Sequence, residues 1–390
     1  MRYKIWFIFL AAWLLVACSK ESEQTVTPSP VPTPAPTPTP GPDKPDDPDN
    51  PDPTPNPPVV GEGDPMWLVA TTRAGVDDDN EAYSPIQIFL ISGASQTALT
   101  SKPHEGQFLY DGGWYSTIGL KEDPSACIYG FSPAEAASCE ITPLTGSSYH
   151  PGAIMTMKKV NPASGDDLCV IVGVKHAETA IDAKGIPTRG QFAFDRKSDN
   201  YIGLLLDHLF ARIDFKVKVG QDYSKRRHVK IKKLELQSAN ELTDVTVKLT
   251  AGSSDFTVDY NTKAVADGTD MPTGIVYDFT VDPKTENKNG VALTTDGTIF
   301  PSYFAPDKDF KIAKGLSLIT TYDVYIIDAN NKIGSRVREN CVAVNSLKDV
   351  NMSSLSRGKK TTLTLTVEPT YLYQLSDDEL DNPGIKIIEN

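Results

Sequence analysis

The residue types that could carry catalysis are scattered along this 390-residue chain. Its five cysteines form no Cys-x-x-Cys pair and no Cys/His cluster at metal-ligand spacing, and its five histidines lie one by one. The motifs His-Glu-x-x-His, Gly-x-Ser-x-Gly and Gly-x-Gly-x-x-Gly are absent. Carboxylates are numerous, but nothing in their spacing marks two of them as a glycosidase pair. The sequence therefore predicts no catalytic residue, no metal site and no cofactor, and we expect a protein that is not an enzyme.

A pair of Cys169 with His176 or His208 is the combination closest to a nucleophilic site. Cys169 lies within the apolar run Leu-Cys-Val-Ile-Val at residues 168–172. A thiolate is disfavoured among apolar side chains, so such a cysteine is typical of a packing position. We therefore expect Cys169 to lie in a core rather than to react.

Cys127 and Cys139 flank a turn expected around Pro133, and this spacing leaves two interpretations open. The two thiols could form a disulfide between neighbouring strands, as in many exported proteins. They could also serve as two small buried hydrophobic residues. The second interpretation is favoured, because cysteine is too rare elsewhere in the chain to indicate a disulfide framework.

Cys18 is the one cysteine whose context predicts a reaction. Residues 1–4 carry positive charge, and the apolar segment 5–16 that follows is too short to span a membrane permanently. The run Leu-Val-Ala-Cys at residues 15–18 fits a lipobox, in which cleavage leaves a diacylated cysteine at the new amino terminus. The alternative is an ordinary signal peptide with an incidental cysteine. We expect a lipoprotein signal peptide over residues 1–17 and a membrane anchor on Cys18.

Residues 18–65 are expected to form a spacer without a core. Proline occupies every second position from Pro28 to Pro42, and an acidic run follows at residues 43–52. At ~3.1 Å per residue in polyproline II, roughly forty residues would hold a domain on the order of 100 Å from the membrane. The aspartates could bind calcium weakly, but they lack the glycine and terminal glutamate of an EF-hand loop. A solvated, self-repelling linker is favoured.

The charge of the chain limits its partners. The formal net charge is −13 and the isoelectric point is about 4.9. An excess of carboxylates repels the phosphate backbone, so we expect no nucleic-acid partner.

The chain after residue 65 is predicted to be all-β. A central segment, residues 209–219, alternates apolar with polar side chains, which places Phe210 with Arg212 and Asp214 on the solvent face of a strand. The unbroken apolar run before it, residues 201–206, suits the inside of a sandwich or a domain junction. No long amphipathic helix is predicted, and the remaining runs are short and bounded by turn residues. The other expected strands are 66–72, 86–91, 106–110, 126–131, 167–175, 191–194, 230–237, 242–249, 256–259, 276–281, 298–300, 316–327 and 361–367.

We expect two β-sandwich domains joined near residue 206. The first covers residues 66–206 and the second residues 207–390. The second half again consists of short β-prone runs bounded by turn residues, without clear sequence identity to the first. The last stretch, residues 371–390, is acidic and then apolar. It could be a terminal strand or a tail that waits for a partner.

Arg73 gives a more specific hypothesis. It follows a β-prone run and precedes the small residue Ala74 and a polar loop, which is typical of an accessible site for an arginine-specific protease. Cleavage after Arg73 would allow the preceding strand to leave its sheet, and a strand from another subunit could fill the groove. The alternative is an ordinary first strand with Arg73 in a turn. The candidate exchanged residues are Trp67, Leu68, Val69, Ala70 and Thr71.

Several stretches, in this order, resemble the fimbrillin family, the type V pilins of Gram-negative anaerobes. They are the lipobox at Cys18, residues 70–74, 128–133 and 167–170, and the strand His-Leu-x-x-Arg-Ile-x-Phe at residues 208–215. The resemblance implies two transthyretin-like β-sandwiches, export as a lipoprotein, cleavage at the arginine that matches Arg73, and polymerisation by donor-strand exchange with other pilin subunits. It implies no catalysis. The Lys/acidic tract at residues 19–23 resembles the one that sends such lipoproteins to the outer face of the outer membrane.

Two further alternatives remain open. The long spacer suits a subunit that stays attached, so the chain could be a stalk or tip pilin, or an anchoring or accessory subunit, with host or bacterial surface ligands as partners. A surface glycan-binding lipoprotein would share the anchor, the spacer and the sandwiches. It would need exposed aromatic residues, for which Tyr110, Trp114 and Tyr115 are the candidates, although a core or hairpin cluster is favoured for them.

Overall fold

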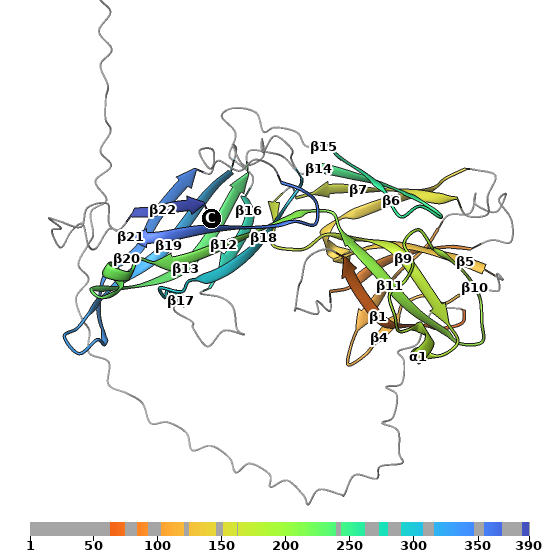
Figure 1. The fold of residues 1–390 in the computed structure, drawn as a ribbon, viewed down its shortest axis with the longest axis horizontal. Coiled ribbons are helices and arrows are strands. Elements are labelled where there is room, and N and C mark those ends of the chain that lie inside the picture. Colours follow the sequence, from red (N-terminus) through yellow and green to blue (C-terminus); the bar gives the residue numbers. More distant parts are fainter. Residues whose placement is uncertain are drawn as a thin grey trace, which may run out of the picture. The chain divides into compact units, whose positions relative to one another are not determined.

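The structure is a computed structural model, and it is built almost entirely of β-strands (Figure 1). The two α-helices of the described residues, α1 (Ala180–Ala183) and α2 (Gln221–Ser224), have about one turn each. The prediction of an all-β protein is therefore confirmed. The structure describes residues 63–74, 84–92, 103–120, 125–145, 151–161, 163–238, 243–261, 273–279, 290–306, 316–346, 355–368 and 384–389.

The first sheet contains eight strands and has β1 at one end of its order. Strand β1 runs parallel to β11, and every other pair in this sheet is antiparallel. The order is β1 (Met66–Ala74), β11 (Asn200–His208), β9 (Cys169–Ala177), β5 (Ser125–Ser132), β2 (Ile86–Ser92), β3 (His104–Tyr110) and β4 (Trp114–Ser116), with β10 (Ala193–Asp195) beside β5.

A second sheet joins segments from both sides of residue 207. The hairpin of β14 (Thr243–Thr250) and β15 (Thr257–Asn261) pairs with β7 (Gly152–Val160), which in turn pairs with β6 (Ser138–Pro143). Strands β14 and β15 follow the central strand in sequence, but they pair with β7, which precedes it. The division into residues 66–206 and 207–390 stays a prediction.

The central strand lies in the third sheet. This strand, β12 (Ala211–Val219), pairs in parallel with β21 (Lys360–Glu368) and antiparallel with β18 (Thr298–Phe304). The sheet ends in β22 (Gly384–Glu389) at one side and β8 (Ala163–Ser164) at the other. The described part of the acidic C-terminal stretch, β22, is thus a strand.

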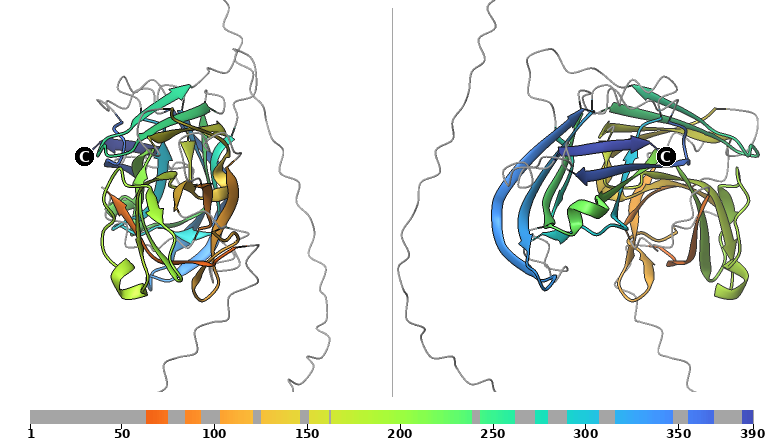
Figure 2. Two further views of the ribbon diagram at one scale, coloured as in Figure 1. Left: turned by 90° about the vertical axis from the view of Figure 1, so that its right-hand side faces the viewer. Right: turned by 60° about the vertical axis from the view of Figure 1, so that its left-hand side comes forward.

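The fourth sheet contains the two longest hairpin strands, which curve together (blue in Figure 2). Strand β19 (Leu316–Ile327) pairs with β20 (Ile333–Ser346), which ends the sheet order. The remaining strands are β13 (Arg227–Ser238), β16 (Thr273–Asp278) and β17 (Val291–Ala292).

The expected alternation of the central strand is observed from Ala211 onward, where the inward side chains are buried. Phe210 was placed on the solvent face, and this was wrong, because Phe210 precedes the strand and lies in the core. Asp214 is buried as well, and it accepts a hydrogen bond of 2.6 Å from Arg212 Nε, which compensates a carboxylate that has left water.

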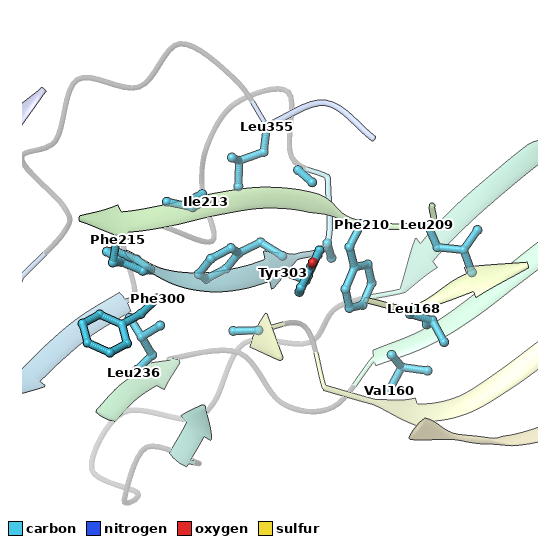
Figure 3. Packing of buried hydrophobic residues seen from close by; sticks show 14 of the residues in the cluster. Val160, Leu168, Leu209, Phe210, Ile213, Phe215, Leu236, Phe300, Tyr303 and Leu355 are labelled. Carbon is cyan, nitrogen blue, oxygen red and sulfur yellow. The ribbon is translucent and has the colours of Figure 1, made fainter. Parts of the chain in front are cut away.

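Buried apolar residues form two clusters. The larger one contains residues from all four sheets, and part of it is drawn in Figure 3. The smaller one lies on the other face of the first sheet, where β1, β11, β2 and β5 contribute most of its side chains. Strand β11 supplies both clusters, with Leu205 in the larger and Ile202, Leu204 and Leu206 in the smaller. This explains why its sequence is apolar without interruption.

Candidate functional site

Among the described strands, β1 forms backbone ladder hydrogen bonds with β11 alone, although its side chains are part of a core. Its backbone pairs in parallel with β11 from Met66, opposite Asn200, to Ala74, opposite Asp207, with an irregularity between Leu68 and Ala70. Just before β1, Asp64 and Leu120 exchange two backbone hydrogen bonds of 2.7 and 2.8 Å. The outer edge of β1 has no partner strand among the described residues.

The inward side chains of β1 complete the smaller core cluster. Met66 and Leu68 are 1% and 4% exposed and pack in the cluster that contains Ile202 and Leu204 of β11. The intervening residues Trp67 and Val69 are half-buried. If β1 left the sheet, β11 would keep its pairing with β9 but lose its hydrogen-bonding neighbour on the other side. The smaller core cluster would then be open to solvent.

Strand β11 is fixed independently of β1. At its C-terminal end, Asp207 forms ion pairs of 2.8 Å with Arg189 and 3.2 Å with Arg357. The adjacent His208 is also anchored, through Asp167. The template strand thus has polar contacts that would remain if β1 dissociated.

Arg73 and Ala74 lie within β1, opposite Leu206 and Asp207. The strand was expected to end at Thr72, and the pairing with β11 extends it by two residues. A protease needs an extended segment free of its sheet, so cleavage after Arg73 requires the end of β1 to separate locally from β11. The remaining residues of the predicted cleavage loop, from Gly75, lie outside the described residues.

The predicted lipidation site, Cys18, and the predicted linker up to residue 62 also lie outside the described residues. Within the part of the chain that is described, no helix combines the length and hydropathy needed to cross a membrane.

The structure brings Asp167, Cys169 and His208 together in the interior. His208 Nδ1 lies 2.8 Å from the Asp167 carboxylate and 3.6 Å from Cys169 Sγ, and all three residues are buried. A catalytic triad uses the two imidazole nitrogens separately, one for the orienting carboxylate and one for the nucleophile. Here one nitrogen faces both groups, while Nε2 is buried without a hydrogen-bond partner. The arrangement suits a buried polar pair, Asp167 with His208, that joins the segment just before β9 to the end of β11. Cys169 lies in the core beside this pair, as expected.

His176, the other histidine considered with Cys169, faces elsewhere. Its Nε2 lies 3.0 Å from Asn200 Oδ1, and its ring stacks on Phe194 at 4.8 Å. Burial lowers the pKa of His176, and the hydrogen bond to Asn200 opposes that effect. Asp167 and His208 both belong to the fimbrillin-like stretches, but their contact across 41 positions could not be derived from either stretch alone.

The candidate glycan-binding residues do not form one platform. Tyr110 and Trp114 are opposite each other in the β3–β4 hairpin, with ring centroids 5.5 Å apart. Tyr115 is the next residue along β4, so its side chain points to the opposite face. Trp114 packs against the smaller core cluster. This geometry favours the hairpin cluster over an exposed aromatic surface.

Cys127 and Cys139 are both free thiols. Cys127 lies in β5 of the first sheet and Cys139 in β6 of the second, so they are not neighbours across one strand pair. Burial raises the pKa of each thiol to about 12, which keeps both protonated at neutral pH. Of the two interpretations, the structure supports the second, in which both cysteines are small packing residues.

The described strands thus define an all-β protein of four sheets, and the order of the first sheet ends at β1. No protein-family model matches the chain, and no curated protein matches it either. Among solved structures, a fimbrial protein from Bacteroides vulgatus is 12% identical with a TM-score of 0.33, covering 84% of this chain and 98% of that one. The fimbrial anchor protein Mfa2 from Porphyromonas gingivalis is 12% identical with a TM-score of 0.27, covering 83% of this chain and 97% of that one.

Proposed function

We propose that this chain is a structural subunit of a cell-surface pilus in which β1 is the exchangeable strand. The observation that carries the proposal is the position of β1. It ends its sheet, pairs only with β11 among the described strands, and supplies Met66 and Leu68 to a core cluster. The fimbrillin-like stretches of the sequence support the same conclusion.

Strand exchange follows from the chemistry of the opened edge. Without β1, the outer N–H and C=O groups of β11 lack partners, and two apolar positions spaced by two residues are vacant. An extended strand from another subunit offers backbone groups along its length and side chains at every second position. A donor with apolar residues in that spacing would replace both contributions of β1.

The proposal includes an anchor at the outer membrane. Cys18 would carry acyl chains, and the proline-rich spacer would hold the folded part away from the surface. An uncut chain would then be an attached anchor or accessory subunit, and a cut chain would be released for assembly into a fibre.

The experiment is cleavage by an arginine-specific protease, followed by amino-terminal sequencing and electrophoresis without heating. We expect a new terminus at Ala74 and a ladder of SDS-resistant multimers. Arg73→Ala should abolish both, and Arg338→Ala, a matched control at an exposed arginine of β20, should change neither. A parent chain that stays uncut and monomeric would disprove exchange of β1.

The anchor is tested separately by metabolic labelling with an alkyne fatty acid. The parent chain should carry the label and fractionate with the outer membrane, and Cys18→Ser should carry none. Labelling that persists in Cys18→Ser would place the acyl chains elsewhere.

A further inference from the structure

A pocket of about 510 Å³ opens between the segment after β7, Phe210 and strand β16. Its volume is within the range of roughly 300–1,000 Å³ that is common for ligand sites. No residue of β1 or of the smaller core cluster lines it, so the pocket is separate from the proposed exchange groove.

The wall of this pocket is partly apolar and partly polar, with Asn161, Ser164 and Asp166 among its polar residues. Val160, Leu168 and Phe210 belong to the larger core cluster and are buried, and Figure 3 shows Phe210 beside Leu168 and Val160. Val276 contributes an exposed apolar side chain at β16. Tyr277 also lines the pocket, and its hydroxyl donates a hydrogen bond to the Pro301 carbonyl. A ligand with a hydrocarbon portion would be favoured by these contacts.

One wall of the pocket carries a carboxylate without a counter-charge. Asp166 lines the pocket, and no lysine or arginine of the described residues forms an ion pair with it. Its backbone N–H donates to Ser164 Oγ, which orients the loop but leaves the carboxylate unpaired. Desolvation in the pocket and, secondarily, the nearby Glu135 carboxylate raise the pKa of Asp166. Asp166 is exposed, so its carboxylate is accessible to a cation that enters the pocket.

We infer that this pocket binds the side chain of a lysine or arginine presented by a protein partner. The alkyl stem would lie against Val160, Leu168 and Phe210, and the ammonium or guanidinium group would pair with Asp166. Lysine and arginine combine these two properties, since a hydrocarbon stem carries their charge. The site is independent of β1, and it would give the protein an adhesive contact that does not use strand exchange.

Binding is measured on the full, uncleaved chain by calorimetry or ligand-observed NMR. The probes are Nα-acetyl-lysine methylamide and its uncharged analogue Nα-acetyl-norleucine methylamide. We expect the lysine probe to bind about tenfold or more tightly than the norleucine probe. Equal affinity for the two probes would overturn the inference.

Variants locate the site. Asp166→Asn should remove the preference for the lysine probe, whereas Asp255→Asn, which removes an equal charge from an exposed position outside the pocket, should retain it. Ala136→Trp should block both probes by filling the pocket, with circular dichroism as the check on folding. An unchanged preference in Asp166→Asn would contradict the assignment.

A third probe distinguishes the source of the cation. Glucosamine carries an ammonium group on a sugar, without a flexible alkyl stem. Weaker binding of glucosamine than of the lysine probe is expected, and tighter binding would overturn the assignment to a protein side chain. Neither result depends on cleavage at Arg73, so failure here and failure of the proposed function are separable.

Discussion

Strands β1 and β20 both end a sheet, but their apolar side chains differ in burial. In β1, Met66 and Leu68 are buried in the smaller core cluster. In β20, Val342 and Val344 are 61% and 64% exposed. Val337, Cys341 and Ala343 of β20 pack, partly buried, against the larger core cluster, so both edge strands touch a core, but only β20 also has these two exposed valines.

A buried polar network adds to the apolar packing of β20. The register of β19 and β20 shifts between Tyr322 and Val324, so that Asp323 faces an irregular segment of β20. The Asp323 carboxylate is buried, accepts the Asn340 N–H at 2.8 Å and lies 3.3 Å from Lys232 Nζ.

The difference shows what removal of each strand would do. Loss of β1 would expose positions filled by fully buried side chains and open a hydrophobic groove, whereas loss of β20 would remove partly buried side chains and break a polar network. Strand exchange is therefore expected at β1.

The largest effect is expected from Leu68→Ala. A buried leucine shortened to alanine loses transfer free energy and leaves a cavity, so the free energy of unfolding should fall by about 2–5 kcal/mol. Val344→Ala in β20 is the matched control and should change it by less than about 0.5 kcal/mol. Chemical denaturation measures both, and similar losses would remove the distinction between the two edges.

The same pair of variants should differ in protease sensitivity. Cleavage after Arg73 requires β1 to separate from β11, and each ~1.4 kcal/mol by which that opening becomes easier raises the open population tenfold. Leu68→Ala should therefore be cut at Arg73 at least about ten times faster than the parent, and Val344→Ala at the parent rate. Equal rates for both variants would mean that β1 need not open for cleavage.

Asp323→Asn tests the polar anchor of β20. The amide lacks the charge that pairs with Lys232, so we expect the free energy of unfolding to fall by about 1–3 kcal/mol. Asp328→Asn, in the β19–β20 turn, is a comparison that keeps a similar side chain. Hydrogen exchange of β20 amides should rise in Asp323→Asn, and unchanged protection there would contradict the anchoring effect.

Gly119→Ala should loosen the entry to β1. A Cβ at Gly119 would lie 2.7 Å from the Gly63 carbonyl carbon, next to the Asp64–Leu120 hydrogen bonds. We expect a loss of about 1–2 kcal/mol of stability because backbone must shift. Gly334→Ala in β20, where the nearest atom is 3.3 Å away, should have a smaller effect in the same denaturation assay.

The smallest effect is expected from the double variant Val342→Thr with Val344→Thr. Both residues are exposed and threonine keeps the β-branched shape, so stability should change by less than about 0.5 kcal/mol per site. A larger loss would show that this face of β20 is covered in the folded protein, and would bring the two edge strands closer in kind.

The sequence patterns predicted those strands whose own residues show a local pattern of apolar side chains. Residues 316–327 were predicted as a strand, and β19 has the same bounds. The alternation after Ala211 likewise located β12. Strand β20 was not predicted, because its exposed sequence, rich in Arg, Glu and Asn, lacks an alternating apolar face and is extended by pairing with β19. Phe210 was misplaced because alternation does not show where a strand begins.

The candidate site was predicted in part. The sequence located the edge residues of β1, but not their parallel pairing with β11, which lies more than a hundred residues later. It also marked Asp167 and His208 without showing that they are in contact. The pocket around Asp166 had no sequence signal, because its lining comes from four separate segments.

By itself, the sequence determined that this is an all-β protein with short, turn-bounded strands, because side-chain periodicity and turn residues act on the chain locally. The tertiary structure alone decided that β1 pairs with β11, that β14 and β15 join β7, and that Asp166 faces a pocket. These features depend on which strand faces can be buried against one another and which backbone edges remain to be paired. Such choices are made between segments far apart in the chain, where local patterns carry no information.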